Sequence, residues 1–151
     1  MPAGGGRVVI EIKPGASQAY VKTQRTEVLS QRAEAVFANL DVDIARRELA
    51  VIGKQFAMGE ERLLLREVKS QGPGNALILT IEHDAGCEVI AEFGMRGRSA
   101  EVVARSAARE AKVFLGTDAV IGRHLADQLL VPMTLSAGGS FTTVKPSRHT
   151  V

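Results

Sequence analysis

The residues best suited to chemistry lie near the carboxyl end of the chain. On a helix, His124, Asp127 and Gln128 stand at positions i, i+3 and i+4, so three hydrogen-bonding side chains share one face. Pro132 follows on the same predicted helix, where it lacks a backbone donor and crowds the carbonyl four residues back. We therefore expect a polar face that could bind a ligand, next to a helix kink.

Three sequence clusters follow one another in this region: Arg123–Gln128, Gly139–Thr143 and Pro146–His149. They resemble the C-terminal helix, strand and turn motifs of the RNA 3'-terminal phosphate cyclase family. Upstream segments that resemble further family signatures, in the expected order, are Pro2–Gly6, Gln71–Asn75 and Ser99–Val103. The resemblance covers the whole chain and implies a C-terminal fragment of a longer polypeptide, whose N-terminal half is missing.

This resemblance implies an enzyme that uses ATP, with a divalent cation (Mg²⁺ or Mn²⁺), to convert an RNA 3'-phosphate into a 2',3'-cyclic phosphate. In such enzymes a histidine is adenylylated, AMP passes to the RNA phosphate, and the neighbouring 2'-hydroxyl displaces it. By motif, His149 would be the nucleophile. Elementary chemistry agrees, because a histidine with an unperturbed pKa of about 6.5 is mostly neutral at neutral pH and needs no separate base.

The resemblance also assigns the polar helix face to the nucleotide. Asp127 and Gln128 match family positions that contact the adenylate, and a carboxylate is a suitable partner for ribose hydroxyls. His124 stands where the family often has a tyrosine, so it would present a flat ring beside the nucleotide. Ser147 is predicted to hydrogen-bond the backbone two or three residues on, which would cap a helix N-terminus that carries His149.

These residues also have purely structural interpretations. Without the motif set, Asp127 is better explained as the salt-bridge partner of Arg123, worth about 0.3 to 0.5 kcal/mol, and Gln128 as part of a solvated face. His83 falls in a predicted hairpin turn with no second ligand nearby, so we interpret it as structural. The sequence shows no zinc-ligand spacing.

Basic residues Arg105, Arg109 and Lys112 recur at helical spacing and could track phosphates. However, Glu101 precedes Arg105 by four residues, in the order that favours pairing on a helix. The preferred interpretation is therefore a solvated charged face. A net charge of +2 is too small to argue for nucleic-acid binding, and 4% aromatic residues argue against a stacking platform for single strands.

Composition indicates a globular protein, because 45% of the 151 residues are hydrophobic and 24% are charged. The sequence has no apolar run long enough to cross a bilayer and no signal-peptide pattern. We expect a cytoplasmic protein with no membrane partner. The single cysteine, Cys87, excludes an internal disulfide, and its place in a predicted strand suggests packing.

Periodicity predicts a mixed α+β fold. We expect one helix over residues 45–56, capped by Asp41 or Asp43 and stopped by Gly59, and another from the cap Ser99 to Gly116. Predicted strands cover residues 8–12, 29–38, 63–68, 77–82, 88–93 and 141–145, with the fourth and fifth forming a hairpin.

The resemblance implies two domains. Residues 1–17 and 99–151 would be parts of a large catalytic domain of repeated sheet-and-helix units, like enolpyruvylshikimate-phosphate synthase. Residues 18–98 would form a small insert domain of thioredoxin-like topology. The glycines of Pro2–Gly6 are not followed by the lysine and serine of a P-loop, so we interpret them as a turn.

Two classes of function remain. The leading hypothesis is the cyclase, whose partners are ATP and RNA 3'-phosphate ends. The alternative is a non-catalytic cyclase-like protein that binds RNA during ribosomal RNA processing, a branch that typically lacks the active histidine. The presence of His149 favours the enzyme. The isolated fragment is expected to be inactive, because the resemblance places the triphosphate and metal positions in the missing half.

Overall fold

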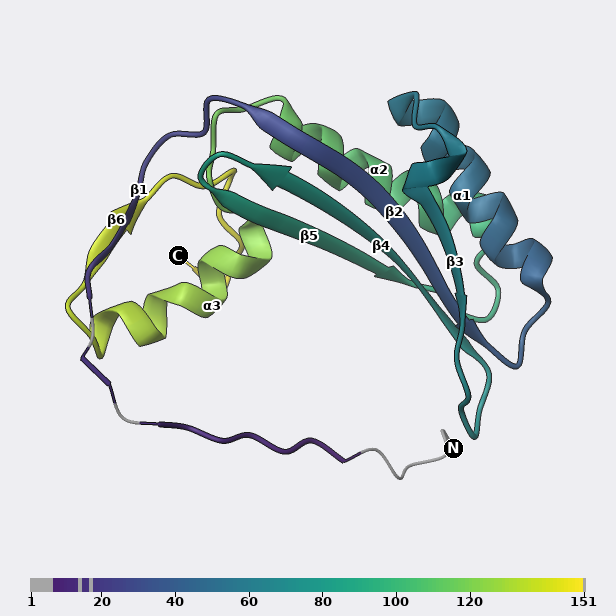
Figure 1. The fold of residues 1–151 in the computed structure, drawn as a ribbon, viewed down its shortest axis with the longest axis horizontal. Coiled ribbons are helices and arrows are strands. Elements are labelled where there is room, and N and C mark those ends of the chain that lie inside the picture. The colour runs from purple at the N-terminus through teal and green to yellow at the C-terminus, as the bar shows by residue number, and fades with distance from the viewer. Residues whose placement is uncertain (1–6, 14, 17, 151) are drawn as a thin grey trace.

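The computed structural model describes residues 7–13, 15–16 and 18–150. The Pro2–Gly6 turn lies outside the described residues. The fold is mixed α+β, as predicted (Figure 1). In chain order the elements are β1 (Tyr20–Lys22), β2 (Val28–Ala38), α1 (Val42–Phe56), a 3-10 turn (Glu60–Arg62), β3 (Leu63–Glu67), β4 (Gly74–His83), β5 (Gly86–Phe93), α2 (Ala100–Leu115), α3 (Arg123–Thr134) and β6 (Gly139–Phe141).

The main sheet has four strands in the order β3-β2-β4-β5. Strands β2 and β3 are parallel, so the chain needs a crossover between them, which α1 provides. Strands β4 and β5 form the predicted antiparallel hairpin. His83 pairs with Gly86 as the last pair of this hairpin, so it belongs to β4 rather than to the turn.

The core lies between this sheet and the two helices α1 and α2. Alternate residues of β2, namely Ala33, Ala35 and Phe37, point into it and are buried. The buried side of α2 consists largely of alanines, which let the helix axis approach the sheet closely. The core residues contributed by the helices are Ala45, Leu49, Ile52, Val103, Ala104, Ala107, Ala108, Ala111 and Phe114.

The helix ends follow mostly from local sequence. Asp41 caps α1 by accepting a hydrogen bond from the Asp43 amide at 2.9 Å, and Ser99 caps α2 through the Val102 amide. The predicted stop of α1 at Gly59 is wrong. The helix ends at Phe56, because Ala57 takes a left-handed conformation with φ of 50° that closes the last turn.

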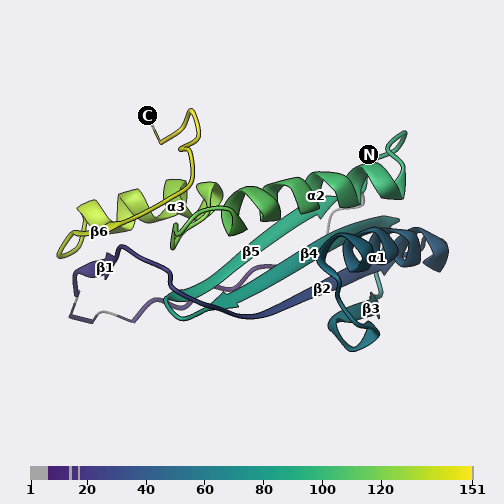
Figure 2. The same ribbon diagram turned by 90° about the horizontal axis from the view of Figure 1, so that it is seen from above.

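The helix α3 lies beyond the end of α2 (Figure 2) and continues through Pro132 to Thr134. After it, β6 pairs in parallel with β1, and Gly139 lies opposite Tyr20. A Cβ atom on Gly139 would lie 2.0 Å from the Tyr20 carbonyl oxygen, and Gly139 has a φ of +144°, so only glycine permits this contact. The observed strand β6 begins two residues before the predicted strand over residues 141–145. Of the predicted residues, Phe141 is in β6 and Thr143 forms an isolated bridge to Ile121.

The predicted strand over residues 8–12 is wrong. The side chains of Val8, Val9, Ile10 and Ile12 are 75% to 85% exposed. In the described part of the chain this segment runs apart from both sheets (Figure 1). Alternating apolar residues form a strand only where backbone donors and acceptors find a partner, and within the described structure residues 8–12 find none.

A buried arginine joins the segment before β2 to the end of α2. Arg25 is 7% exposed. Its Nε donates to the Ala119 carbonyl at 3.2 Å, and Nη2 donates to the carbonyls of Phe114, at 3.0 Å, and Thr117. The guanidinium also lies 4.6 Å from the centre of the Phe114 ring. These bonds pair the carbonyls of Thr117 and Ala119, which lie just beyond the end of α2, and add a donor to the Phe114 carbonyl, which also accepts from Thr117.

Replacement Arg25→Ala should lower the free energy of unfolding by about 3 kcal/mol, because it removes a buried cation and leaves the carbonyls of Thr117 and Ala119 without their side-chain donor. Urea denaturation followed by circular dichroism measures this change. The control is Arg32→Ala, since Arg32 is exposed on β2 and should change stability by less than about 0.5 kcal/mol. Equal effects of the two substitutions would contradict the role given to Arg25.

Candidate functional site

The turn that carries His149 is attached to α3 by a single carboxylate. Ser147 Oγ donates to Asp127 Oδ2 at 2.7 Å, and the Thr150 hydroxyl donates to Asp127 Oδ1. Both carboxylate oxygens are therefore used. Asp127 is half-buried and Ser147 is buried, so these bonds are partly shielded from water.

The turn itself is ordered by Ser147. Its Oγ accepts a hydrogen bond from the His149 amide at 3.0 Å, and its carbonyl accepts one from the Thr150 amide at 3.3 Å. The predicted bond from Ser147 to the backbone two residues on is thus confirmed. The described residues form a turn here rather than a helix, and the His149 side chain is exposed.

The structure brings together some of the predicted site residues and separates others. Asp127 and the turn of His149 are in contact, and Gln128 is exposed on the next position of α3. His124 instead lies against α2, where its Nε2 is 3.2 Å from Glu110 Oε1. It takes no part in the hydrogen bonds around Asp127. The nucleotide-binding roles of these three residues stay predictions.

The alternative explanation of Asp127 as the partner of Arg123 is wrong. Within residues 18–150 no ion pair joins them, because the carboxylate is turned toward the hydroxyls of Ser147 and Thr150. Thr150 was not expected from the sequence. Its position three residues after Ser147, at the end of a Pro-Ser turn, is the only signal that it closes the same turn.

A buried carboxylate holds the beginning of α3. Glu88 of β5 is 4% exposed, and its Oε2 accepts a hydrogen bond from the amide of Gly122, the N-cap residue of α3, at 2.9 Å. A Cβ on Gly122 would lie 1.8 Å from Glu88 Oε1, so a side chain at this position would displace the Glu88 carboxylate. Glu88, Glu110 and His124 line one cavity of about 410 Å³.

Burial raises the pKa of Glu88, and the hydrogen bond from Gly122 opposes this only in part. Sequence reasoning missed Glu88, although a signal was present. In an alternating strand whose inward positions include Ile90, the residue two before it must also point inward. The same alternation turns Cys87 outward, so the expected packing of Cys87 is wrong and the thiol is exposed.

His83 has a structural environment. It is 4% exposed, its ring centre lies 5.8 Å from that of Phe114, and burial, followed by the charge of Arg25, lowers its pKa.

In the part of the chain that the structure describes, no group of three or more His, Cys, Asp or Glu side chains could hold a metal ion. No helix among the described residues has the length and apolarity to cross a membrane.

Comparison with known proteins gives a consistent result. Residues 23–115 match the family model described as RNA 3'-terminal phosphate cyclase (RTC), insert domain. The chain is 38% identical over 149 residues to an RNA 3'-terminal phosphate cyclase of Salmonella enteritidis and 40% identical over 150 residues to one of Koribacter versatilis. These alignments cover 98% of this chain but 44% and 42% of the relatives.

The matched model covers more than half of the chain and describes one particular domain of one enzyme family. The chain therefore belongs to the RNA 3'-terminal phosphate cyclase family. It spans less than half the length of the curated relatives it matches.

Replacement Glu88→Gln should raise the melting temperature near pH 7. The raised pKa means that the fold disfavours the charged carboxylate. The charge therefore costs no folding free energy below the unfolded pKa of about 4.3. The full cost applies once the pH exceeds the folded pKa. Glutamine keeps an acceptor for Gly122 without the charge. Thermal unfolding at several pH values should show the advantage shrinking toward pH 4. An advantage independent of pH would contradict this explanation.

Replacement Asp127→Ala should release the turn of His149, because the hydroxyls of Ser147 and Thr150 lose their shared acceptor. We expect a loss of about 1 to 2 kcal/mol in the free energy of local opening. Faster amide hydrogen exchange at residues 147–150 measures it. Gln128→Ala is the matched control, since Gln128 is exposed on the same helix and no hydrogen bond joins its side chain to the turn in the described structure.

Proposed function

We propose that this chain is the C-terminal part of an enzyme that uses ATP to convert an RNA 3'-phosphate into a 2',3'-cyclic phosphate, with His149 as the nucleophile. Its membership of the cyclase family supports the reaction class. The observation that carries the choice of residue is the anchoring of the His149 turn to α3 through Asp127.

The proposed reaction has three transfers. An imidazole nitrogen of His149 attacks the α-phosphorus of ATP, and pyrophosphate leaves. An oxygen of the RNA 3'-phosphate then displaces the histidine from the adenylyl group. Finally the neighbouring 2'-hydroxyl attacks the activated phosphorus, loses its proton and releases AMP. The exposed side chain and restrained backbone of His149 suit a group that must meet a large substrate in a fixed direction.

The other site residues receive distinct roles. Asp127, whose two oxygens are occupied by hydroxyls, would position the nucleophile's turn, and Gln128 would contact the adenylate from the same face. His124 would reach the nucleotide only by leaving Glu110. A divalent cation would neutralise phosphate charge, but the described residues offer no cluster fit to hold one.

We also propose a division of the fold. The main sheet with α1 and α2 would form the insert domain, because the family model runs to residue 115 and α2 packs into the same core. This boundary lies beyond the expected one at residue 98. The strand order, with one parallel crossover followed by an antiparallel hairpin, supports a thioredoxin-like topology. The elements β1, α3 and β6 would belong to the large domain, like that of enolpyruvylshikimate-phosphate synthase. This also moves β1 out of the expected insert of residues 18–98, because the family model begins at residue 23 and β1 pairs with β6.

The test is covalent labelling of the full-length protein with ATP that carries the label at the α-phosphate. The unmodified protein should retain label after denaturation, and His149→Asn should lose it by at least about a hundredfold, since the attacking nitrogen is removed. Arg32→Gln, an exposed change on β2 away from the candidate site, is the control and should keep the label. Undiminished labelling of His149→Asn would refute the assignment. Absence of label in the unmodified protein would favour the non-catalytic, RNA-binding alternative.

A further inference from the structure

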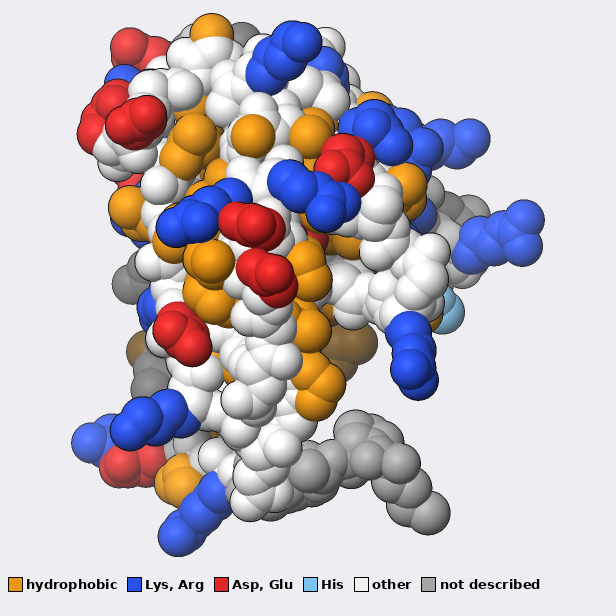
Figure 3. All heavy atoms as spheres, turned by 90° about the vertical axis from the view of Figure 1, so that its right-hand side faces the viewer, with side chains coloured by type: hydrophobic (Ala, Val, Ile, Leu, Met, Phe, Trp, Pro, Cys, Tyr) orange, Lys and Arg blue, Asp and Glu red, His pale blue; other side chains and the backbone are white. Residues whose placement is uncertain are grey.

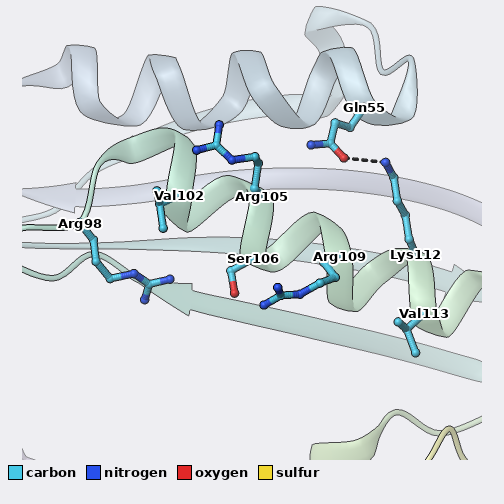
Figure 4. A pocket seen from close by; sticks show the side chains of 8 residues that line it. All are labelled: Gln55, Arg98, Val102, Arg105, Ser106, Arg109, Lys112 and Val113. Carbon is cyan, nitrogen blue, oxygen red and sulfur yellow. Dashed lines mark hydrogen bonds between the residues drawn. The ribbon is translucent and has the colours of Figure 1, made fainter.

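The helix α2 has two chemically different sides. One side packs into the core, and the other exposes Arg105, Arg109 and Lys112. The exposed side forms an open groove of about 670 Å³ (Figure 4). It is lined by Gln55, Arg98, Val102, Arg105, Ser106, Arg109, Lys112 and Val113. The lining thus contains four cations and no acid.

The acidic residues near this groove are already engaged. The expected pairing of Glu101 with Arg105 is wrong, because Glu101 Oε1 lies 2.7 Å from Arg47 Nε on α1. Glu92 accepts a hydrogen bond from Ser106 at 2.6 Å and lies 3.5 Å from Arg98. The pairing that favoured a solvated charged face is therefore absent, and Glu101 does not neutralise Arg105.

Two guanidinium groups consequently remain available. In the described part of the chain, Arg105 and Arg109 form neither an ion pair nor a side-chain hydrogen bond, whereas Lys112 donates to Gln55 at 2.6 Å. In Figure 4, Arg105 and Lys112 reach toward α1, and Arg98 and Arg109 lie on the side of α2 nearer β5. The cations therefore flank the groove rather than cluster at one point.

We propose that this groove binds the sugar-phosphate backbone of single-stranded RNA. Arg105 and Arg109 stand one helical turn apart, roughly 6 Å, and Lys112 lies roughly 10 Å along the axis from Arg105, so the row can meet successive phosphates of an extended strand. Arginine binds phosphate oxygens through two parallel N–H groups. The groove lining has no aromatic residue for base stacking, so the contact is independent of base sequence.

The charge arrangement of this groove can be compared with that of one face of the molecule. On the face of the molecule that includes α1 and β3, basic and acidic side chains are interspersed with hydrophobic ones (Figure 3). A polyanion gains little on such a mixed surface, because attraction and repulsion offset each other. The choice of RNA rests on the proposed function, whose substrate this groove would hold at a distance from the reacting end.

Fluorescence anisotropy of a short labelled RNA strand, titrated with the 151-residue chain, tests the proposal. The double replacement Arg105→Gln and Arg109→Gln should weaken binding about tenfold and reduce the salt dependence, the slope of log K against log salt, by about 1.4. The control is Arg32→Gln with Arg66→Gln, which removes equal charge from strands β2 and β3. Circular dichroism verifies that both variants fold.

Several results would overturn the proposal. One is equal loss of binding in both double variants, which would reflect net charge alone. Another is competition by polyglutamate as strong as that by unlabelled RNA, which would indicate an acidic protein partner. RNAs ending in a 3'-hydroxyl and in a 3'-phosphate should bind equally, because the groove contacts the backbone. In the full-length protein, labelling by ATP should be unchanged in the Arg105 and Arg109 variant, so failure of the groove and failure of His149 are separable.

Discussion

The buried guanidinium of Arg25 is the contact on which the arrangement of the C-terminal region depends. It binds carbonyls at the end of α2 and in the loop that follows, and so determines where the chain leaves the helical layer. Arginine suits this position because it keeps its charge when buried and offers five donors in a fixed plane. A lysine would present a single ammonium and could not reach the same set of acceptors.

Two carboxylates continue this chain of contacts to the candidate site. Glu88 extends from the main sheet to the first turn of α3, and Asp127 extends from α3 to the turn of His149. Each carboxylate accepts hydrogen bonds in a partly or fully buried place, where water competes little for them. The position of His149 is therefore coupled, through side chains rather than through continuous backbone structure, to the main sheet.

Most regular elements of the main sheet were predictable from sequence, because alternation in β2, β4 and β5 and the caps Asp41 and Ser99 are local signals. The ordered motifs near the carboxyl end also predicted the family and the contact of Ser147 with the His149 backbone. Local signals could not predict the orientation of His124 toward Glu110 or of Glu101 toward Arg47, because both partners come from distant segments. The strand prediction for residues 8–12 failed for the same reason, because a strand forms only where a neighbouring strand pairs with it.

The pairing of β1 with β6 joins segments more than a hundred residues apart in the chain and involves three residues on each side. Closing so large a loop is entropically costly, and the few hydrogen bonds gained repay it only after the intervening sheet and helices have folded. This small parallel ladder should accordingly be the last part of the molecule to assemble. It should also be the first to separate in native-state fluctuations, which would free the carboxyl end while the core of the main sheet stays intact.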